Sequence, residues 1–151
     1  MFLILFSEND VRGENVLLHF ERQSRPAWHN NYIPSVYFSI YTADGKKKVG
    51  ECDLRLGMDD ELYYAGNIGY RIYEPYRGHH YAYDACCLLL PVARDRYGMK
   101  ELIVTCSPEN TASRKTLERL NGTLVKTVDV PKDHWLYKRG EKVKNIYRFE
   151  F

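Results

Sequence analysis

The residues with the clearest chemical potential form a short run between two predicted elements, Tyr76-Arg77-Gly78-His79-His80-Tyr81-Ala82. Residues 68–72 before it combine aromatic and β-branched side chains as a strand does, and residues 82–97 after it show helical spacing. The run is therefore predicted to be a strand-to-helix turn. The run contains a glycine and no nearby acid, so the unpaired N–H groups of such a helix start are free to bind an anion. A phosphate or pyrophosphate is the expected ligand, with Arg77 as a charged partner. A turn without a ligand is the alternative, because one glycine is weak evidence.

A second group of charged side chains lies on one face of a predicted strand. The hairpin turn Ala43-Asp44-Gly45-Lys46 leads into a returning strand over residues 49–56. Because side chains alternate along a strand, Glu51, Asp53 and Arg55 share a face. That face borders either solvent, the commoner outcome for exposed antiparallel strands, or a polar cleft.

The remaining patterns predict a mixed α/β chain. The helix over residues 81–97 has a core-facing apolar stripe, with Pro91 expected to kink or widen it. Residues 102–106 form an apolar run typical of a strand buried on both faces, so strand, helix and strand imply a right-handed crossover with parallel strands. Further strands are expected over residues 1–6, 36–41, 123–130 and 143–151, a second helix over 107–121, a strand or short helix over 16–22, and loops over 23–35, 57–66 and 131–141.

The central strand and turn together resemble motif A of the GNAT N-acetyltransferase superfamily, which reads Arg or Gln, two residues, Gly, one residue, then Gly or Ala. Arg77 and Ala82 match its ends with the spacing intact, and His80 stands at the position of the motif's glycine. A second match follows, because residues 110–113 and 117–122 resemble the family's Asn-x-x-Ala/Ser helix and its Lys-Leu-Gly-like stop. The form of the turn is most similar to the branch that holds ribosomal-protein N-terminal and polyamine acetyltransferases.

This resemblance implies the fold. We expect an α/β (α+β) fold with a mixed, mostly antiparallel central sheet of roughly six to seven strands, a parallel splayed pair at its centre and flanking helices. One domain is expected over residues 1–151. The family usually places two helices between its first two strands, where they wall one side of the acceptor site. Residues 23–35 leave little room for them, so this helical region is expected to be shortened.

The resemblance also implies acetyl-coenzyme A as co-substrate. The pantetheine arm is expected between the splayed strands, where backbone groups of residues 70–72 would bind it and polarise the thioester carbonyl. Asn110 is expected to contact the pantetheine or the diphosphate, with helix capping as the alternative for Asn110 and Ser113. The expected cofactor contacts are Tyr70, Arg71, Ile72, Arg77, Gly78, His79, His80, Tyr81, Ala82, Asn110 and Ser113.

Two features of the histidine pair in the turn bear on this site. The family's glycine allows close backbone approach, so His80 either leans over the pyrophosphate or blocks the turn. A metal site at His79 and His80 is not expected, because adjacent side chains in a tight turn point apart and no third ligand has suitable spacing.

Acetyl transfer to an amine requires a neutral amine and a proton for the leaving thiolate. In the family's order the strand with Asp53 and Glu51 lies beside the splayed strand, so these are the candidate bases. Many members use a tyrosine of the second motif's helix as the acid, but Leu117 stands at that position. Tyr147 is the candidate substitute. Other candidates for the acid are Tyr137, Ser107 and Cys106.

Composition limits the class of protein. A net charge of +2, from 22 basic and 20 acidic residues, argues against nucleic acid held by bulk electrostatics. The longest apolar run is far shorter than the ~20 residues of a membrane span, so no membrane partner is expected. The four cysteines follow no disulfide or zinc spacing, which favours free thiols and a cytoplasmic location.

The sequence therefore predicts an acetyl-coenzyme A-dependent N-acetyltransferase that acts on a primary amine of a small molecule, a protein or a peptide. A homodimer is a possible assembly of this enzyme. The alternative is a catalytically weak acyl-coenzyme A sensor or interaction module, favoured by Leu117 and His80. A nucleotide-binding domain is disfavoured because no Gly-Lys-Ser/Thr loop is present. Residues 59–61 would suit a cationic amine or simply be solvated. Residues 132–139, with His134 and Trp135, are a candidate lid over the acceptor.

Overall fold

Antiparallel strands dominate the chain. The computed structural model describes residues 5–6 and 9–151, and it contains two sheets within them. The larger sheet has the strand order β1-β2-β3-β4-β5-β6 and the smaller sheet has the order β7-β9-β8. The strands are β1 (Leu5–Phe6), β2 (Asp10–Arg12), β3 (Val16–Gln23), β4 (Ser35–Thr42), β5 (Lys48–Arg55), β6 (Ile68–Ile72), β7 (Glu101–Cys106), β8 (Thr123–Asp129) and β9 (Val143–Glu150).

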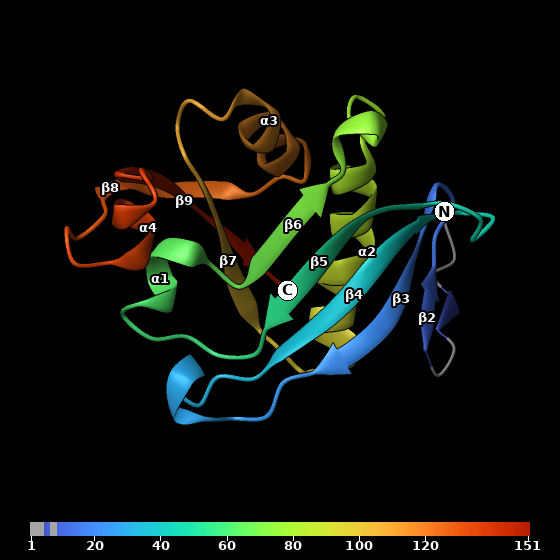
Figure 1. Ribbon diagram of the computed structural model, residues 1–151, viewed down its shortest axis with the longest axis horizontal. Coiled ribbons are helices and arrows are strands. Elements are labelled where there is room, and N and C mark those ends of the chain that lie inside the picture. The colour runs from blue at the N-terminus through green and yellow to red at the C-terminus, as the bar shows by residue number, and fades with distance from the viewer. Residues whose placement is uncertain (1–4, 7–8) are drawn as a thin grey trace.

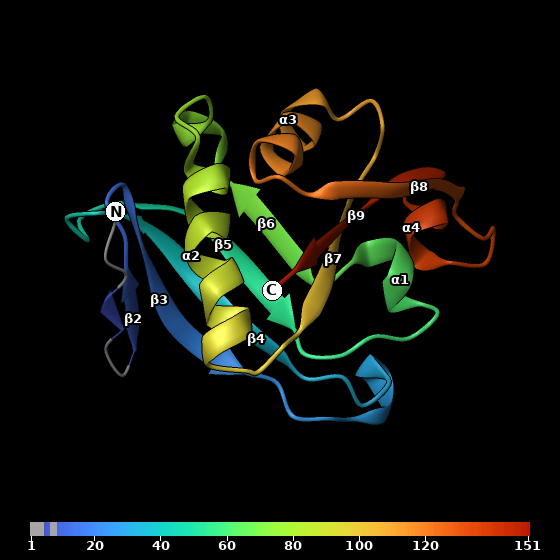
Figure 2. The same cartoon turned by 180° about the vertical axis from the view of Figure 1, so that it is seen from behind.

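The helices complete the fold expected from the sequence (Figures 1 and 2). They are α1 (Leu62–Ala65), α2 (Tyr81–Asp95), α3 (Thr111–Arg119) and α4 (Trp135–Lys138), with 3-10 turns η1 (Trp28–Asn30) and η2 (Glu74–Tyr76). The mixed α/β prediction is confirmed, and α2 runs through Pro91. The loops predicted over residues 57–66 and 131–141 are corrected, since each contains one helical turn. The strand predicted over residues 1–6 is described at Leu5–Phe6 only, because residues 1–4 lie outside the described part.

The two faces of the larger sheet differ in what covers them. One face carries apolar residues such as Phe38 and Leu54, which are buried with Leu89 and Val92 of α2 in a single core. Figure 2 shows α2 lying across this face. Between β3 and β4 the only helical element is η1, so the shortened helical region is confirmed. The opposite face of the sheet, which carries Glu51, Asp53 and Arg55, is the polar face, and neither α2 nor α3 covers it.

The two sheets meet at β6 and β7 and then separate. Figure 1 shows both strands running in the same general direction, from neighbouring starts toward α2 and α3. The expected splayed pair is present, since β6 and β7 belong to different sheets and, among the described residues, one isolated bridge joins Gly66 to Val104. Beyond this contact, each strand leaves one edge unpaired toward the other.

Asn67 holds the two sheets together at the base of this split. Its side-chain nitrogen donates to the carbonyl oxygens of Arg55 (3.0 Å) and Gly57 (2.8 Å), and its side-chain oxygen accepts from the N–H of Ile103 (3.0 Å). The backbone N–H of Asn67 donates to the carbonyl oxygen of Ile103 at 2.7 Å. Asn67 is buried, so these bonds are shielded from water and costly to lose.

We expect Asn67→Asp to lower the free energy of unfolding by ~3 kcal/mol, because a carboxylate cannot donate to the two carbonyl oxygens and becomes a buried charge. Denaturant unfolding measures this. Asn121→Asp is the matched control, since Asn121 is exposed in a left-handed conformation (φ 63°) that aspartate also adopts. Equal free energies of unfolding for the two variants would show that the Asn67 side chain does not hold the two sheets together.

Candidate functional site

A cleft of about 300 Å³ opens where β6 and β7 diverge. Gly69 and Tyr70 of β6 line one side, and Cys106 with the following Ser107 lines the other. Ser113 of α3 lines the end of the cleft nearest the helices. The predicted gap between the central strands is therefore present as a lined cleft.

The backbone of β6 offers hydrogen-bonding groups to this cleft at alternate residues. Arg55 N–H donates to the carbonyl of Asn67, and Tyr73 N–H donates to the carbonyl of Val49. With the register of β5 and β6, these bonds place residues 67, 69, 71 and 73 in the hydrogen-bonded pairs of the ladder. Residues 70 and 72 then turn their N–H and C=O groups toward the open edge of β6, where Tyr70 lines the cleft and the carbonyl oxygen of Ile72 accepts from Arg77. The backbone of Arg71 faces β5, and its side chain is exposed, so the structure does not bring Arg71 to the cleft.

Tyr70 crosses the cleft. Its phenol is hydrogen-bonded to the side chain of Ser113 on α3. Burial raises the pKa of the Tyr70 phenol well above its usual value, which the hydrogen bond to Ser113 opposes. Tyr70 and Ser113 therefore join β6 to α3 across the gap, and the phenol stays protonated at neutral pH.

The predicted turn is present between η2 and α2, and all its members from Arg77 to His80 are exposed. Gly78 (φ 87°) and His80 (φ 62°) both adopt positive φ, and His80 is the N-cap of α2. His80 therefore occupies a conformation that favours glycine, which is the residue of the family motif. Arg77 Nε donates to the carbonyl oxygen of Ile72 at 3.0 Å, so the arginine is folded back toward the end of β6.

The start of α2 carries an acid that the sequence prediction overlooked. Asp84 lies in the first turn of the helix, and its carboxylate accepts a hydrogen bond from the side-chain amide of Asn15 at 3.3 Å. The expectation of no nearby acid is therefore corrected. The exposed N–H groups of the turn still precede Asp84 in the chain.

Asn110 caps α3, as the alternative to cofactor binding predicted. Its side-chain oxygen accepts from the backbone N–H of Ser113 at 3.2 Å. The amide nitrogen of Asn110 is not part of this cap, and Asn110 lines the cleft beside Ser113. Capping and ligand contact are therefore compatible at this residue.

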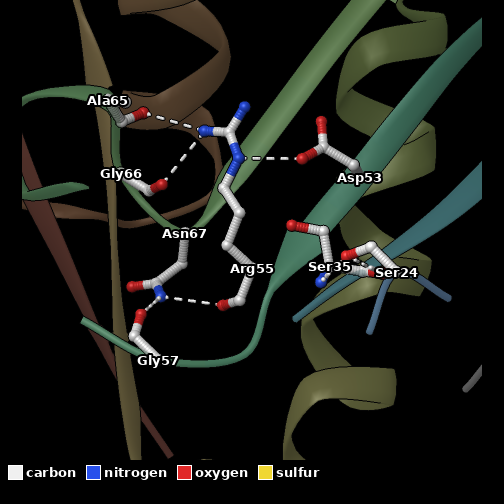
Figure 3. A network of polar contacts seen from close by, with 8 residues as sticks. All are labelled: Ser24, Ser35, Asp53, Arg55, Gly57, Ala65, Gly66 and Asn67. Atoms are coloured by element: carbon white, nitrogen blue, oxygen red, sulfur yellow. Dashed lines mark hydrogen bonds and ion pairs between the residues drawn. The ribbon is translucent and has the colours of Figure 1, made fainter. Parts of the chain in front are cut away.

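The two candidate bases lie on the polar face, in a hollow of about 590 Å³ rather than in the cleft. Asp53 accepts from Arg55 Nε at 2.8 Å, and Arg55 Nη1 also donates to the carbonyl oxygens of Ala65 and Gly66 (Figure 3). Burial raises the pKa of the Asp53 carboxyl, which the charge of Arg55 opposes. Glu51 is half exposed and accepts from the Tyr73 hydroxyl at 3.3 Å.

Among the candidate acids, Tyr147 lies in the core, Ser107 and Cys106 line the cleft, and Tyr137 of α4 does neither. Tyr147 is 2% exposed and packs in the core, and burial raises the pKa of its phenol. The structure does not place it among the residues that line the cleft. Leu117 is fully buried, as an apolar residue at the family's tyrosine position would be. Ser107 and Cys106 do line the cleft, and burial raises the pKa of the Cys106 thiol.

The wall opposite Tyr70 comes from the segment predicted to be a lid. Trp135 of α4, Arg139 and Glu141 line the cleft together with Lys144 of β9. The ring of His134 fixes this segment, because its Nε2 lies 2.8 Å from the carbonyl oxygen of Glu61 and its Nδ1 accepts from Leu136 N–H. Sequence reasoning missed Glu141 and Lys144, since charged residues beside a polar loop gave no signal that the chain folds them inward.

Metal and membrane features complete the description. The described residues contain no group of three or more His, Cys, Asp or Glu side chains able to hold a metal ion. All four cysteines are free thiols. No helix within residues 5–6 and 9–151 is long and apolar enough to cross a membrane.

Comparison with known proteins identifies relatives of this arrangement. The family model described as "Acetyltransferase (GNAT) domain" matches residues 9–123. A ribosomal-protein-S5-alanine acetyltransferase from Vibrio fischeri is similar in structure, with a TM-score of 0.62, 18% identity, and coverage of 82% of this chain and 63% of that one. No curated protein matches by sequence.

Two further similar structures were solved with ligands. RimL, a ribosomal L7/L12 α-N-protein acetyltransferase in complex with coenzyme A, has a TM-score of 0.60 and 18% identity, over 78% of this chain and 62% of that one. The microcin C7 self-immunity acetyltransferase MccE, in complex with acetyl-CoA and AMP, has a TM-score of 0.57 and 18% identity, over 78% of this chain and 61% of that one. The aligned part of this chain thus spans less than two thirds of the length of these relatives.

We expect His80→Gly to raise the free energy of unfolding by up to ~1 kcal/mol, because glycine adopts the left-handed conformation without strain. Thermal unfolding measures this. His79→Gly is the matched control and should be destabilising, since His79 does not have positive φ. An acetyl-coenzyme A affinity more than about tenfold higher in His80→Gly would indicate that the histidine side chain blocks the turn.

Proposed function

Since the chain belongs to the GNAT acetyltransferase family, we propose that it binds acetyl-coenzyme A between β6 and β7 and transfers the acetyl group to a primary amine of a small molecule or peptide. One observation carries this proposal. Backbone groups of Tyr70 face the cleft, and β6 continues through η2 to the exposed turn that begins α2. A long ligand with an anionic middle suits such a combination of sites.

The residues present fit the coenzyme in three places. The turn from Arg77 to His80 would hold the pyrophosphate, with Arg77 exchanging the carbonyl oxygen of Ile72 for a phosphate oxygen. The N–H and C=O groups at residues 70 and 72 would pair with the amides of the pantetheine arm. Ser113 would face that arm from α3, once Tyr70 releases its hydroxyl.

Direct transfer requires a carbonyl polarised by a donor, a neutral amine and a proton for the thiolate. A backbone N–H on the cleft edge of β6 would polarise the thioester. Asp53 is the better of the two predicted bases, since its raised pKa makes it a stronger proton acceptor than an exposed carboxylate. Ser107 and Cys106 are the predicted acids that the cleft contains, whereas Tyr147 would need to leave the core.

The alternative is an acyl-coenzyme A sensor or interaction module without efficient catalysis. The specific observation in its favour is Leu117, which is 0% exposed and leaves no acid at the family's tyrosine position. Saturable binding of acetyl-coenzyme A without turnover on any amine would support this alternative. The cytoplasmic location and the homodimer remain predictions from the sequence.

We expect the double variant Arg77→Ala, Ser113→Ala to bind acetyl-coenzyme A more weakly than the wild type by ~2 kcal/mol or more, because it loses charge-assisted and hydroxyl hydrogen bonds. Calorimetric titration measures this. Arg94→Ala is the matched control, since Arg94 lies exposed near the far end of α2 and pairs with Asp95. No binding by the wild type would contradict the proposed function.

Asp53→Ala tests the predicted base. If Asp53 deprotonates the amine, turnover should fall by about 100-fold or more at neutral pH and recover as the pH rises, because more of the amine is then neutral without help. Steady-state kinetics against pH measure this. Unchanged turnover across the neutral and alkaline range would remove Asp53 as the base.

A further inference from the structure

A carboxylate oxygen beside the cleft has no hydrogen-bond partner. Glu141 lines the cleft just before β9, and its Oε1 accepts from the ammonium group of Lys144 at 2.6 Å. Its Oε2 is buried and accepts no hydrogen bond from any residue that the structure describes. A buried carboxylate oxygen in this state is costly, so the site is set to receive a donor.

A largely exposed arginine forms an ion pair with this oxygen. Arg139 Nε lies 3.4 Å from Glu141 Oε2, without hydrogen-bond geometry. The Arg139 side chain is 68% exposed, and its guanidinium lies 5.6 Å from the centre of the Trp135 ring. Because the arginine is mostly solvated, an incoming ammonium group can displace it at little cost.

Lys144 fixes the direction of the carboxylate. Its side chain is 7% exposed, and it bonds Glu141 three residues earlier in the chain. Lysine ammonium groups are almost never this buried unless they are paired. The pair therefore holds Oε1 on Lys144 and leaves Oε2 as the oxygen available to a ligand.

The location separates Glu141 from the carboxylates predicted from the sequence. Glu141 lines the same cleft as Tyr70, Ser107 and Ser113, whereas Asp53 and Glu51 line the hollow of the polar face. The cationic groups that line the cleft with Glu141 are Lys144, Arg139 and Arg55, and the last of these is paired with Asp53. Glu141 therefore lines the cleft itself, whereas Asp53 lies beside Gly69, which lines both the cleft and the hollow.

We propose that Glu141 binds the acceptor ammonium group through Oε2 and takes the proton that makes the amine nucleophilic, with Lys144 as its positioning residue. This inference rests on the proposed function. The amine loses two protons in the reaction, one to Glu141 and then to solvent, the other to the departing sulfur. The bond from nitrogen to the acetyl carbon forms, and the bond from that carbon to sulfur breaks.

The same charges define the acceptor class. Glu141 is the one carboxylate among the described residues that line the cleft, and Lys144, Arg139 and Arg55 also line it, so a second positive charge on the acceptor would be repelled. The site therefore suits an amine with a single positive charge, such as the free amino terminus of a neutral or acidic peptide, and disfavours a polyamine.

Kinetics of the 151-residue chain test this inference. The acceptor probes are a mixture of neutral tripeptides covering all uncharged amino-terminal residues, and spermidine, each with acetyl-coenzyme A. We expect Glu141→Gln, which keeps the size of the side chain, to lower kcat/KM for the peptides by about 100-fold while acetyl-coenzyme A affinity changes less than about twofold. The rate of the Glu141→Gln variant should rise by about tenfold per pH unit as the amine becomes neutral, whereas the rate of the wild type should reach a plateau.

Three further variants sharpen the test. Arg139→Gln should lower KM for the peptides, because the arginine that pairs with Glu141 Oε2 is removed. Glu150→Gln should match the wild type, since Glu150 is an exposed glutamate at the far end of β9 and pairs with Arg148. Lys144→Met should lower kcat/KM and alter the pH profile, as loss of a positioning residue would.

Each outcome separates this inference from the proposed function. If the wild type binds no acetyl-coenzyme A, the proposed function fails and the inference fails with it. If the wild type acetylates a peptide and Glu141→Gln is equally active, or is slower with an unchanged pH profile, only the inference is overturned. Binding without turnover, or a preference for spermidine, also overturns the inference and leaves the cofactor site standing.

Discussion

The side chain of Asn67 is the interaction on which the rest of the structure depends. Its buried amide bonds the end of β5, the following loop and β7, while its backbone joins β6 to both neighbours. Two sheets can therefore stay in contact at one end while their edges diverge at the other. Without this clamp, β6 and β7 would either pair along their length and close the cleft, or separate and expose the core.

Because β6 and β7 diverge, some of their backbone N–H and C=O groups have no partner in a sheet. Polar side chains lie around these groups. Tyr70 and Ser113 meet across the cleft, and Arg77 bonds the carbonyl oxygen of Ile72. Each of these contacts is one that a ligand with amides and phosphates can replace. Binding would therefore exchange these interactions rather than simply remove them.

The segment after β8 supplies one wall of this cleft. The ring of His134 accepts from Leu136 N–H through Nδ1, so its Nε2 carries the proton that is donated to the carbonyl oxygen of Glu61. This bond fixes α4 against the segment that precedes β6. As a result Glu141 and Lys144 line the cleft, and the hollow around Asp53 adjoins it at Arg55, Gly69 and Tyr70.

The sequence by itself determined the local elements and the family, because hairpin, turn and helix-start signals depend on residues a few positions apart. The turn at Arg77 to His80 and the positions of Tyr70 and Ser113 followed from such patterns and from motif spacing. Only the tertiary structure decided which edge of β6 is free, that Tyr147 lies in the core, and that the carboxylate lining the cleft is Glu141 rather than Asp53 or Glu51. These facts arise where distant segments meet, and no short-range periodicity records such contacts.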